Sequence, residues 1–186
     1  MDNLISEAVD SREVREIRIV SGLTPDDVEA ILEMAGNSGL FSSDALMAAE
    51  DMAWDSAYGD GREAHTFLQA VTGEEDGART VGFICFGPIA HWTGDYEMYG
   101  IAVDGEFQRL GIGTALVLEM KRQIAANGGK GIFLETGMDR AYENARLFYE
   151  ANDFVQEHRF CKQFIPNDGG VVYRFGVEAE EISQYQ

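Results

Sequence analysis

Hydrophobic and polar positions along the chain follow two different periods, which mark the expected strands and helices. Alternating or continuous apolar runs predict seven strands, at residues 14–20, 65–71, 81–86, 96–103, 131–136, 154–164 and 171–175. Apolar residues three or four positions apart predict four helices, at residues 25–36, 43–58, 111–127 and 141–152. The order β-αα-βββ-α-β-α-ββ indicates an α/β (α+β) protein, with helices packed on a single sheet.

Several helix boundaries carry specific sequence signals. Thr24 precedes Pro25 and two acidic residues, which is typical of a helix start with Thr24 as its N-cap. Ser43 or Asp44 is the expected cap of the second helix. The Asn127-Gly128-Gly129 sequence predicts the end of the third helix, because glycine readily ends a helix in the left-handed conformation.

The bulk composition is that of a globular domain. The length of 186 residues suits one domain spanning residues 1–186, and a hydrophobic content of 45% allows a sizeable core. The last ~10 residues are polar, so we expect them to be flexible.

The chain is strongly acidic: 33 Asp and Glu residues oppose 14 Lys and Arg residues, giving a formal net charge of −19. The cations are too few and too scattered along the chain to form a basic face that could bind a phosphate backbone. DNA or RNA binding is therefore excluded as the main function. The charge is compatible with cationic substrates such as amines, although a solvated acidic surface is the simpler explanation.

The two cysteines, Cys85 and Cys161, lie in apolar strand-like segments without the spacing of a zinc site. We therefore expect buried thiols and no bound metal. The N-terminus lacks a basic segment followed by an apolar core, and no apolar run reaches the length of a membrane span. The expectation is a cytoplasmic protein that does not associate with membranes.

A glycine-rich stretch at residues 107–116, FQRLGIGTAL, precedes the third predicted helix. Gly111 and Gly113 allow a tight turn, and unpaired N–H groups at a helix start attract a phosphate or pyrophosphate. The Walker pattern is absent, because the chain has no Gly-Lys-Ser/Thr. A Rossmann fingerprint fits poorly, since Leu116 occupies the place of its third small residue and the gap after Val103 is long. A turn that caps the helix and binds nothing is the alternative.

The residues Gln108-Arg109-Leu110-Gly111-Ile112-Gly113 match a third pattern, Gln/Arg-x-x-Gly-x-Gly/Ala after a strand. Here the sequence resembles the GNAT superfamily of N-acetyltransferases, in which this loop holds the pyrophosphate of acetyl-CoA. Residues 143–154 resemble the superfamily's second signature, a helix with Ala145 and Tyr149 on one face followed by an aromatic residue, Phe154.

The resemblance covers about residues 96–175, with the coenzyme-binding part at about 96–154. It implies a GNAT-like fold, with one mixed, mostly antiparallel seven-stranded sheet flanked by helices on both faces. The chain departs from the usual pattern at two positions: Asp153 replaces a glycine, and Tyr142 replaces an asparagine for which Asn144 is the expected substitute.

The resemblance also implies how acetyl-CoA, the co-substrate, would bind. Backbone N–H groups on the strand before the loop would hold the thioester carbonyl, freed by a local splay or bulge that Gly100 would ease. Pantetheine would then pair with this strand like an added strand. The implied coenzyme-binding residues are Ile101, Ala102, Val103, Gln108, Arg109, Leu110, Gly111, Ile112, Gly113, Thr114 and Asn144.

Acetyl transfer to an amine requires a base for the attacking nitrogen and an acid for the departing thiolate. Tyr149 matches a tyrosine that many superfamily members place near the coenzyme sulfur, and an ordinary core tyrosine is the alternative. Glu97 is the candidate base, because it should share an apolar strand face with Tyr99, where burial would raise its pKa. If Glu97 points away, a water chain to Asp95 or His91 could replace it.

The acceptor pocket of this fold is walled by the first helices and by the loop before the fourth strand. Aromatic side chains there could hold an ammonium group by cation–π contact, although for Trp54 and Phe41, each taken alone, a place in the core is the better explanation. These candidates are Phe41, Trp54, Tyr58, His91, Trp92 and Tyr96.

The resulting hypothesis is an N-acetyltransferase that moves the acetyl group of acetyl-CoA to a primary amine of a small molecule or peptide by direct attack. Two alternatives remain open: a catalytically silent CoA-binding sensor or interaction module, and a transferase for a longer acyl-CoA. The strand at 171–175 could pair between two copies if it lies at a sheet edge, which would make a homodimer.

Overall fold

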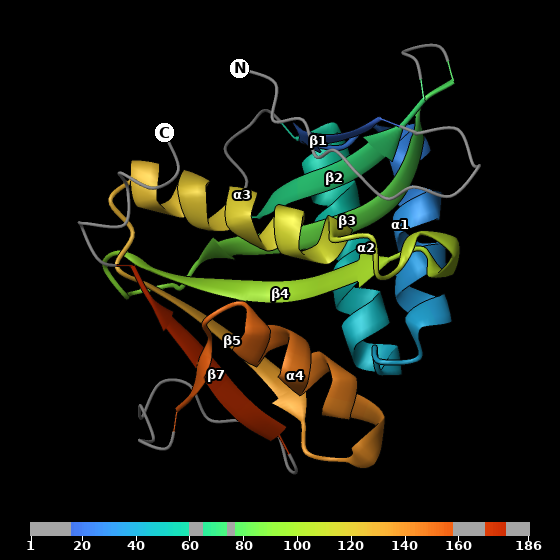
Figure 1. The fold of residues 1–186 in the computed structure, drawn as a ribbon. Helices are drawn as coiled ribbons and strands as arrows, with labels where there is room; N and C mark the ends of the chain where they lie inside the picture. The colour runs from blue at the N-terminus through green and yellow to red at the C-terminus, as the bar shows by residue number, and fades with distance from the viewer. Residues whose placement is uncertain (1–15, 60–64, 74–76, 158–169, 178–186) are drawn as a thin grey trace. The chain divides into compact units, whose positions relative to one another are not determined.

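The computed structural model describes residues 16–59, 65–73, 77–157 and 170–177. Its strands are β1 (Ile17–Ser21), β2 (Thr66–Thr72), β3 (Arg79–Pro88), β4 (Asp95–Val103), β5 (Gly131–Gly137), β6 (Val155–Gln156) and β7 (Gly170–Gly176). Its helices are α1 (Pro25–Ser38), α2 (Ser43–Tyr58), α3 (Ile112–Ala126) and α4 (Glu143–Ala151), with short 3-10 helices η2 (Gly105–Phe107) and η3 (Arg140–Tyr142). The order of strands and α-helices along the chain is the one that the sequence predicts (Figure 1).

The strands form one seven-stranded sheet in the order β1-β2-β3-β4-β5-β7-β6. β4 and β5 are parallel, whereas the β1–β2, β5–β7 and β6–β7 pairs are antiparallel. The predicted mixed sheet of seven strands is therefore confirmed. The prediction of a free sheet edge at residues 171–175 is wrong, because β7 lies between β5 and β6, and β6 pairs with Tyr173 and Arg174.

The chain divides into two compact units. Over the described residues, the first unit contains the chain up to Cys85 together with Gly100–Met120. The second unit contains Phe86–Tyr99 together with the chain from Lys121 onward.

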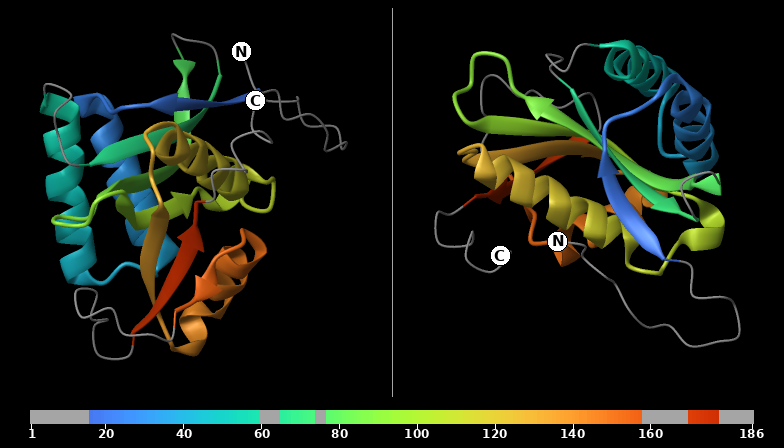
Figure 2. Two further views of the ribbon diagram at one scale, coloured as in Figure 1. Left: turned by 90° about the vertical axis from the view of Figure 1, so that its left-hand side faces the viewer. Right: turned by 90° about the horizontal axis from the view of Figure 1, so that it is seen from above.

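In the first unit, helices cover both faces of β3. A Cβ atom on Gly82 would lie 3.2 Å from Ile112 Cγ2 of α3, so Gly82 faces that helix. Its neighbour Phe83 points to the opposite face, where its ring centroid lies 6.4 Å from that of Phe41 in the α1–α2 connection. α1 and α2 run side by side over this face (Figure 2). Fully buried side chains fill both sides: Val28, Ile31, Leu68, Ile84, Leu116, Val117 and Met120.

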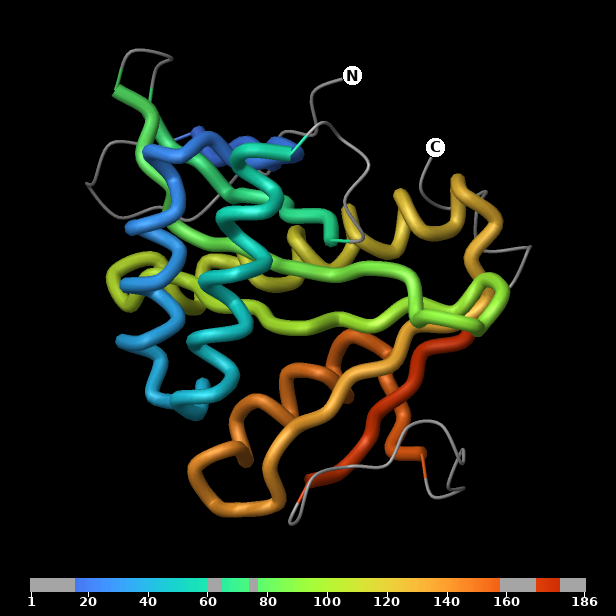
Figure 3. The backbone as a smooth tube through the Cα atoms, turned by 180° about the vertical axis from the view of Figure 1, so that it is seen from behind, coloured from blue at the N-terminus to red at the C-terminus, as the bar shows by residue number. Residues whose placement is uncertain are grey.

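In the second unit, strand register separates two sets of side chains. Glu97 pairs with Phe133, and Phe133 pairs with Arg174, so these three side chains point to one face of β4, β5 and β7. The alternate residues point to the other face, where α4 lies beside β5 and β7 (Figure 3). This second face carries the buried core residues Ile132, Leu134, Tyr173 and Phe175.

The helix starts show which boundary signals were decisive. The Asp27 carboxylate accepts hydrogen bonds from the Thr24 N–H and hydroxyl, at 2.7 and 2.8 Å, which confirms the predicted start of α1. The predicted cap of α2 is wrong by one residue, because Ser42 Oγ accepts the Ala45 N–H at 3.2 Å. Three consecutive residues at this position can each cap a helix, so local sequence could not choose among them.

The last predicted helix is shorter than expected, and the strand predicted after it is described only in part. In place of the single helix predicted at 141–152, the chain forms η3 and then α4. The turn between β5 and α4 folds back and is held by Arg146. Arg146 Nη1 donates hydrogen bonds to the carbonyls of Gly137 and Asp139, at 2.5 and 3.0 Å. Of the strand predicted at 154–164, residues 155–156 form β6, whereas Phe154 and Glu157 are not in a strand. Residues 158–164, including Cys161, lie outside the described residues, as does Val14.

Candidate active site

Glu97 lies in the middle of β4, within the second unit, on a face it shares with Phe133 of β5. Burial, and to a lesser extent the negative charge of Glu135, together raise the pKa of the Glu97 carboxyl to about 7. A carboxylate with such a pKa is half deprotonated near neutral pH, which suits a general base. The direction of the shift is the one that the sequence predicts.

The parallel pairing of β4 with β5 ends at Glu97. The parallel pairing of β4 with β5 joins Asp95, Tyr96 and Glu97 to Gly131, Ile132 and Phe133, although β5 itself continues to Gly137. Where a parallel ladder ends, backbone N–H and C=O groups become available to other partners. The ladder between β4 and β5 thus covers the first three residues of each strand, before Gly100, where the family resemblance implies a splay or bulge.

Glu135 and Arg174 are charged residues of this face that the sequence interpretation did not select. Glu135 stands two residues after Phe133 on β5, so both point to the face of Glu97. The Arg174 guanidinium lies 5.7 Å from the centroid of the Phe133 ring. The alternation Phe133-Leu134-Glu135 places Glu135 on the face of Phe133, but only the pairing of Phe133 with Glu97 shows that this is also the face of Glu97.

Tyr149 lies on the opposite face of the same strands. Its ring centroid is 6.1 Å from that of Tyr173 and 6.2 Å from that of Phe154. Tyr173 pairs with Leu134, whereas Glu97 pairs with Phe133, so Glu97 and Tyr149 are separated by the sheet. Glu97 and Tyr149, the two candidate catalytic groups, therefore lie on opposite faces of the strands in the second unit.

Burial raises the pKa of the Tyr149 phenol to about 12, so this hydroxyl stays protonated at neutral pH. Tyr149 is 9% exposed, and its ring packs against Phe148, Phe154 and Tyr173. A buried, protonated phenol can donate a proton but cannot readily act as a base. Asn144, the expected substitute for the usual asparagine, is exposed in the first turn of α4.

The start of the glycine loop, in the first unit, is fixed by Asp104. Its N–H donates to the Val81 carbonyl at 2.9 Å, and its carboxylate accepts the Glu106 N–H at 2.9 Å. Arg79 Nη2 donates to the other carboxylate oxygen at 2.6 Å, and the Arg79 guanidinium lies 5.7 Å from the centroid of the Phe107 ring. These contacts hold the chain that leads into the loop.

The loop itself adopts the conformation that exposes backbone N–H groups. Arg109 and Gly111 have positive φ angles of 65° and 81°, and the first helical bond of α3 runs from the Ala115 N–H to the Gly111 carbonyl. The N–H groups of the preceding turn have no partner within the helix and carry the positive end of its dipole. Ile112 is buried, which anchors this turn, while the expected ligands Gln108, Arg109, Leu110, Gly111 and Thr114 are exposed and Gly113 is half-buried. Gln108 Nε2 donates to the Val103 carbonyl at 3.2 Å.

The segment expected to bind the thioester carbonyl, Ile101–Val103, forms the C-terminal end of β4 and belongs to the first unit. Ala102 is buried, whereas Ile101 and Val103 are half-buried. Gly100 has a packing role, because a Cβ atom there would lie 2.8 Å from Phe41 Cε1. The Phe41 ring occupies the space that this glycine leaves.

The six predicted acceptor-binding residues do not form one cluster within either unit. In the second unit, the Trp92 ring stands edge-on to Phe133 at 5.4 Å and thus lies on the face of Glu97. Tyr96 pairs with Ile132 and points to the opposite face. His91 is exposed in the loop before β4, where its φ angle is 67°.

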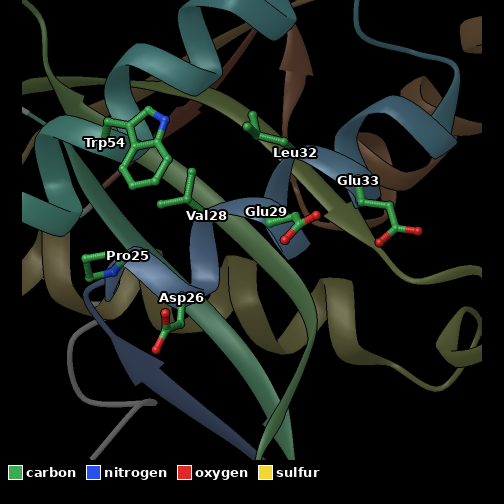
Figure 4. A pocket seen from close by; sticks show the side chains of 7 residues that line it. All are labelled: Pro25, Asp26, Val28, Glu29, Leu32, Glu33 and Trp54. Atoms are coloured by element: carbon green, nitrogen blue, oxygen red, sulfur yellow. The ribbon is translucent and has the colours of Figure 1, made fainter.

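In the first unit, Trp54 belongs to a groove between α1 and α2. The groove has a volume of about 600 Å³. Figure 4 shows the Trp54 side chain together with the lining residues of α1. Trp54 stacks on Tyr58 with ring centroids 5.6 Å apart, and both side chains are exposed. Phe41 is half-buried against Gly100 and Phe83, as expected of a core residue.

Three further expectations from the sequence concern Cys85, a metal site and a membrane span. Cys85 is buried as a free thiol, and burial strongly raises its pKa, so it is unreactive as a nucleophile. Among the described residues, no group of three or more His, Cys, Asp or Glu side chains is arranged to hold a metal ion. In the same part of the chain, no helix is both long and apolar enough to cross a bilayer.

Comparison with known proteins identifies one family. The model of the acetyltransferase (GNAT) family matches residues 32–154. No curated protein sequence matches the chain.

Solved structures share the fold. A protein of Desulfovibrio desulfuricans assigned to the GNAT acetyltransferases is 26% identical with a TM-score of 0.75, covering 87% of this chain and 99% of that one. The PaiA N-acetyltransferase of Thermoplasma acidophilum, in complex with coenzyme A, is 19% identical with a TM-score of 0.65, covering 86% and 98%. The ribosomal-protein-S18-alanine N-acetyltransferase of Escherichia coli is 18% identical with a TM-score of 0.60, covering 87% and 94%.

Proposed function

Because the chain belongs to the GNAT family of acetyltransferases, we propose that it transfers the acetyl group of acetyl-CoA to a primary amine of a small molecule or peptide. The nitrogen attacks the thioester carbonyl directly, a C–N bond forms and the C–S bond breaks. The products are an N-acetylated amine and free coenzyme A. The observation that carries the proposal is Glu97, a half-buried carboxylate with a pKa of about 7 on the strand that leads to the loop.

Glu97 serves as the general base. The acceptor enters as an ammonium ion and must lose a proton before or during attack. Glu97 accepts this proton, directly or through one water molecule. The aromatic pair of Trp92 and Phe133 on the same face provides an apolar wall that favours the neutral carboxyl and could hold the cationic acceptor.

Tyr149 serves as the general acid. It donates its phenolic proton to the departing thiolate, and its pKa of about 12 keeps that proton in place until the thiolate forms. Because Glu97 and Tyr149 occupy opposite faces of the strands, the group that accepts a proton is distinct from the group that donates one.

The glycine loop is the proposed pyrophosphate site. The N–H groups of Gly111, Ile112, Gly113 and Thr114 stand at the start of α3 and fit the oxygens of a pyrophosphate. The backbone of Ile101–Val103 is the proposed partner of the thioester carbonyl and pantetheine. Coenzyme A complexes of relatives support this assignment, since the PaiA enzyme with the same fold was solved with that ligand.

A thiol-release assay tests the proposal. The protein is incubated with acetyl-CoA and a library of primary amines, and free coenzyme A is followed over time. For the best amine, Glu97→Gln and Tyr149→Phe should lower kcat by about 10²-fold or more and about tenfold or more, respectively. Binding of coenzyme A, measured by calorimetry, should remain within about twofold in both variants, because neither side chain holds the pyrophosphate.

Three outcomes would contradict parts of the proposal. Tight coenzyme A binding without turnover of any amine would favour the silent sensor or interaction module. Full kcat in Tyr149→Phe, with chemistry rate-limiting, would show that Tyr149 is not the acid. Faster thiol release from a longer acyl-CoA than from acetyl-CoA would identify a different acyl donor.

A further inference from the structure

Lys121 of α3, at the start of the second unit's part of that helix, is a buried lysine. Its side chain is 3% exposed, which is rare for this residue type, because removing an ammonium group from water is costly unless its donors are satisfied. The Lys121 Nζ atom donates a hydrogen bond of 2.7 Å to the carbonyl oxygen of Asn152. It also lies 3.5 Å from the centroid of the Phe175 ring and 5.3 Å from that of Phe154.

The group that Lys121 contacts is the end of α4. Asn152 caps this helix: its N–H donates to the Tyr149 carbonyl at 3.0 Å, and its Nδ2 donates to the Phe148 carbonyl at 2.8 Å. The Phe154 N–H donates to the same Tyr149 carbonyl at 3.1 Å. Lys121 thus satisfies a carbonyl at the end of this turn, in which two backbone N–H groups donate to the Tyr149 carbonyl, at the negative end of the helix dipole.

The side chain of Tyr149 rests on the same frame. Its ring contacts Phe154, and Phe154 contacts Phe175 with ring centroids 5.7 Å apart. Both of these phenylalanine rings lie near Lys121 Nζ. One cation therefore contacts the carbonyl cap and the aromatic support of Tyr149 together, by hydrogen bonding and by cation–π interaction.

Asp153, the residue after the cap Asn152, has a backbone conformation that gives a reason for the end of α4 to be held by an additional contact. Asp153 has a φ angle of 64°, in the left-handed region where the family resemblance implies a glycine. Its carboxylate is 4.0 Å from Lys121 Nζ but is 83% exposed, so this pair contributes little. The short contact of Lys121 is with the backbone carbonyl of Asn152, not with that carboxylate.

We propose that Lys121 is a positioning residue for the transfer reaction, holding the end of α4 and its aromatic support so that the Tyr149 hydroxyl is fixed for proton donation. This inference rests on the proposed role of Tyr149 as the acid. Lys121 itself touches neither substrate nor the reacting atoms in this role. A displacement of ~1 Å in the donor can cost as much as ~10²-fold in rate, so a fixed helix end has a kinetic consequence.

A double-mutant cycle tests the proposal. Lys121→Met keeps the side chain's length and removes its N–H donors, and it is measured alone and in the Tyr149→Phe background. Lys121→Met alone should lower kcat about tenfold and leave KM for acetyl-CoA within about twofold. In the Tyr149→Phe background the same change should lower kcat by less than about twofold, because the group it positions is gone.

Two further variants separate positioning from folding. Lys121→Arg retains a buried donor for the Asn152 carbonyl and should recover most of kcat. Arg122→Met removes a cation from the neighbouring, exposed position of α3 and should leave kcat within about twofold. All rates are referred to the folded fraction, measured by coenzyme A binding, so that a destabilised variant is not counted as a slow one.

The outcomes are distinguishable. Equal losses from Lys121→Met in both backgrounds would overturn the role of Lys121 while leaving Tyr149 as the acid. An increase in KM with unchanged kcat would also overturn it. Full kcat in Tyr149→Phe alone would overturn the acid role, and the Lys121 proposal with it.

Discussion

Glu97 of β4 and Glu135 of β5 point to the same face of two parallel strands, and the charge of Glu135 adds to the effect of burial on the pKa of Glu97. The register pairs Glu97 with Phe133, and Glu135 lies two residues after Phe133 on β5, so its side chain points to the same face as that of Glu97. Two carboxylates so arranged resist simultaneous ionisation, which keeps one of them protonated closer to neutral pH.

The rate should therefore depend on pH through Glu97. A general base must be deprotonated, so kcat/KM should rise with pH and level off above the Glu97 pKa of about 7. In Glu97→Gln this limb should vanish along with most of the activity. A pH profile of kcat/KM from pH 5 to 9, taken with an amine whose own pKa lies outside this range, measures it. An unchanged limb in the variant would assign it to another group.

Folding stability should depend on pH in the direction opposite to kcat/KM, so that the contribution of Glu97 to stability falls as pH rises. The Glu97 pKa is raised from 4.5 to about 7 on folding, so between these values the folded state binds more protons than the unfolded state. Stability contributed by the protonated carboxyl is present below pH 4.5 and is lost as pH rises through 7. Thermal unfolding should therefore find Glu97→Gln more stable than the wild type at pH 8 and no more stable at pH 4. The reverse order would show that Glu97 is stabilised as a carboxylate.

Removing the Glu135 charge should shift the pH profile. In Glu135→Gln the Glu97 pKa should fall, because one of the two causes that raise it is gone, and the rising limb should move to lower pH. The shift should be smaller than the full departure of Glu97 from its ordinary value, since burial remains the larger cause. Glu50→Gln removes an equal charge from an exposed position of α2 and serves as the control. A limb that does not move would mean that the two groups do not interact.

The glycine loop should be sensitive at Gly111 and tolerant at Gly105. Gly111 has a φ angle of 81°, whereas Gly105 has no positive φ, and a Cβ atom on either would meet no neighbour within 4 Å. Gly111→Val should strain the turn by about 1–2 kcal/mol and raise KM for acetyl-CoA about tenfold, while Gly105→Ala should leave it within about twofold. Calorimetric affinity for coenzyme A in both variants checks this. Equal effects would show that backbone conformation at Gly111 does not matter for binding.

Gly100 and Phe41 should be coupled in stability. A Cβ atom on Gly100 would lie 2.8 Å from the Phe41 ring, so Gly100→Ala should destabilise the fold by about 1–2 kcal/mol. Phe41→Leu frees that space and should remove most of the penalty of Gly100→Ala when the two changes are combined. Urea unfolding of the four proteins of the cycle measures the coupling. Additive losses would show that the ring and the glycine do not compete for one volume.

Local features of the chain were predictable from local sequence. The apolar period, the Thr24 start of α1 and the tight turn at Gly111 depend on residues within one or two helical turns, so the sequence alone indicates them. The spacing of Ala145 and Tyr149 likewise follows from helical geometry. The cap of α2 was not predictable, because Ser42, Ser43 and Asp44 are equally able caps and packing selects among them.

What only the tertiary structure decided depends on contacts between residues far apart in the chain. Strand register places Glu135 beside Glu97 and puts Tyr149 over the opposite face, and no local pattern sets that register. The burial of Lys121 is another example, since in sequence it is one of two adjacent cations in an amphipathic helix, and it is buried because α4 ends and β7 packs at that point. The sequence determined the elements and the residue types available for chemistry, because periodicity and caps are short-range. The pairing of strands determined which of those residues meet, because burial and charge act through space.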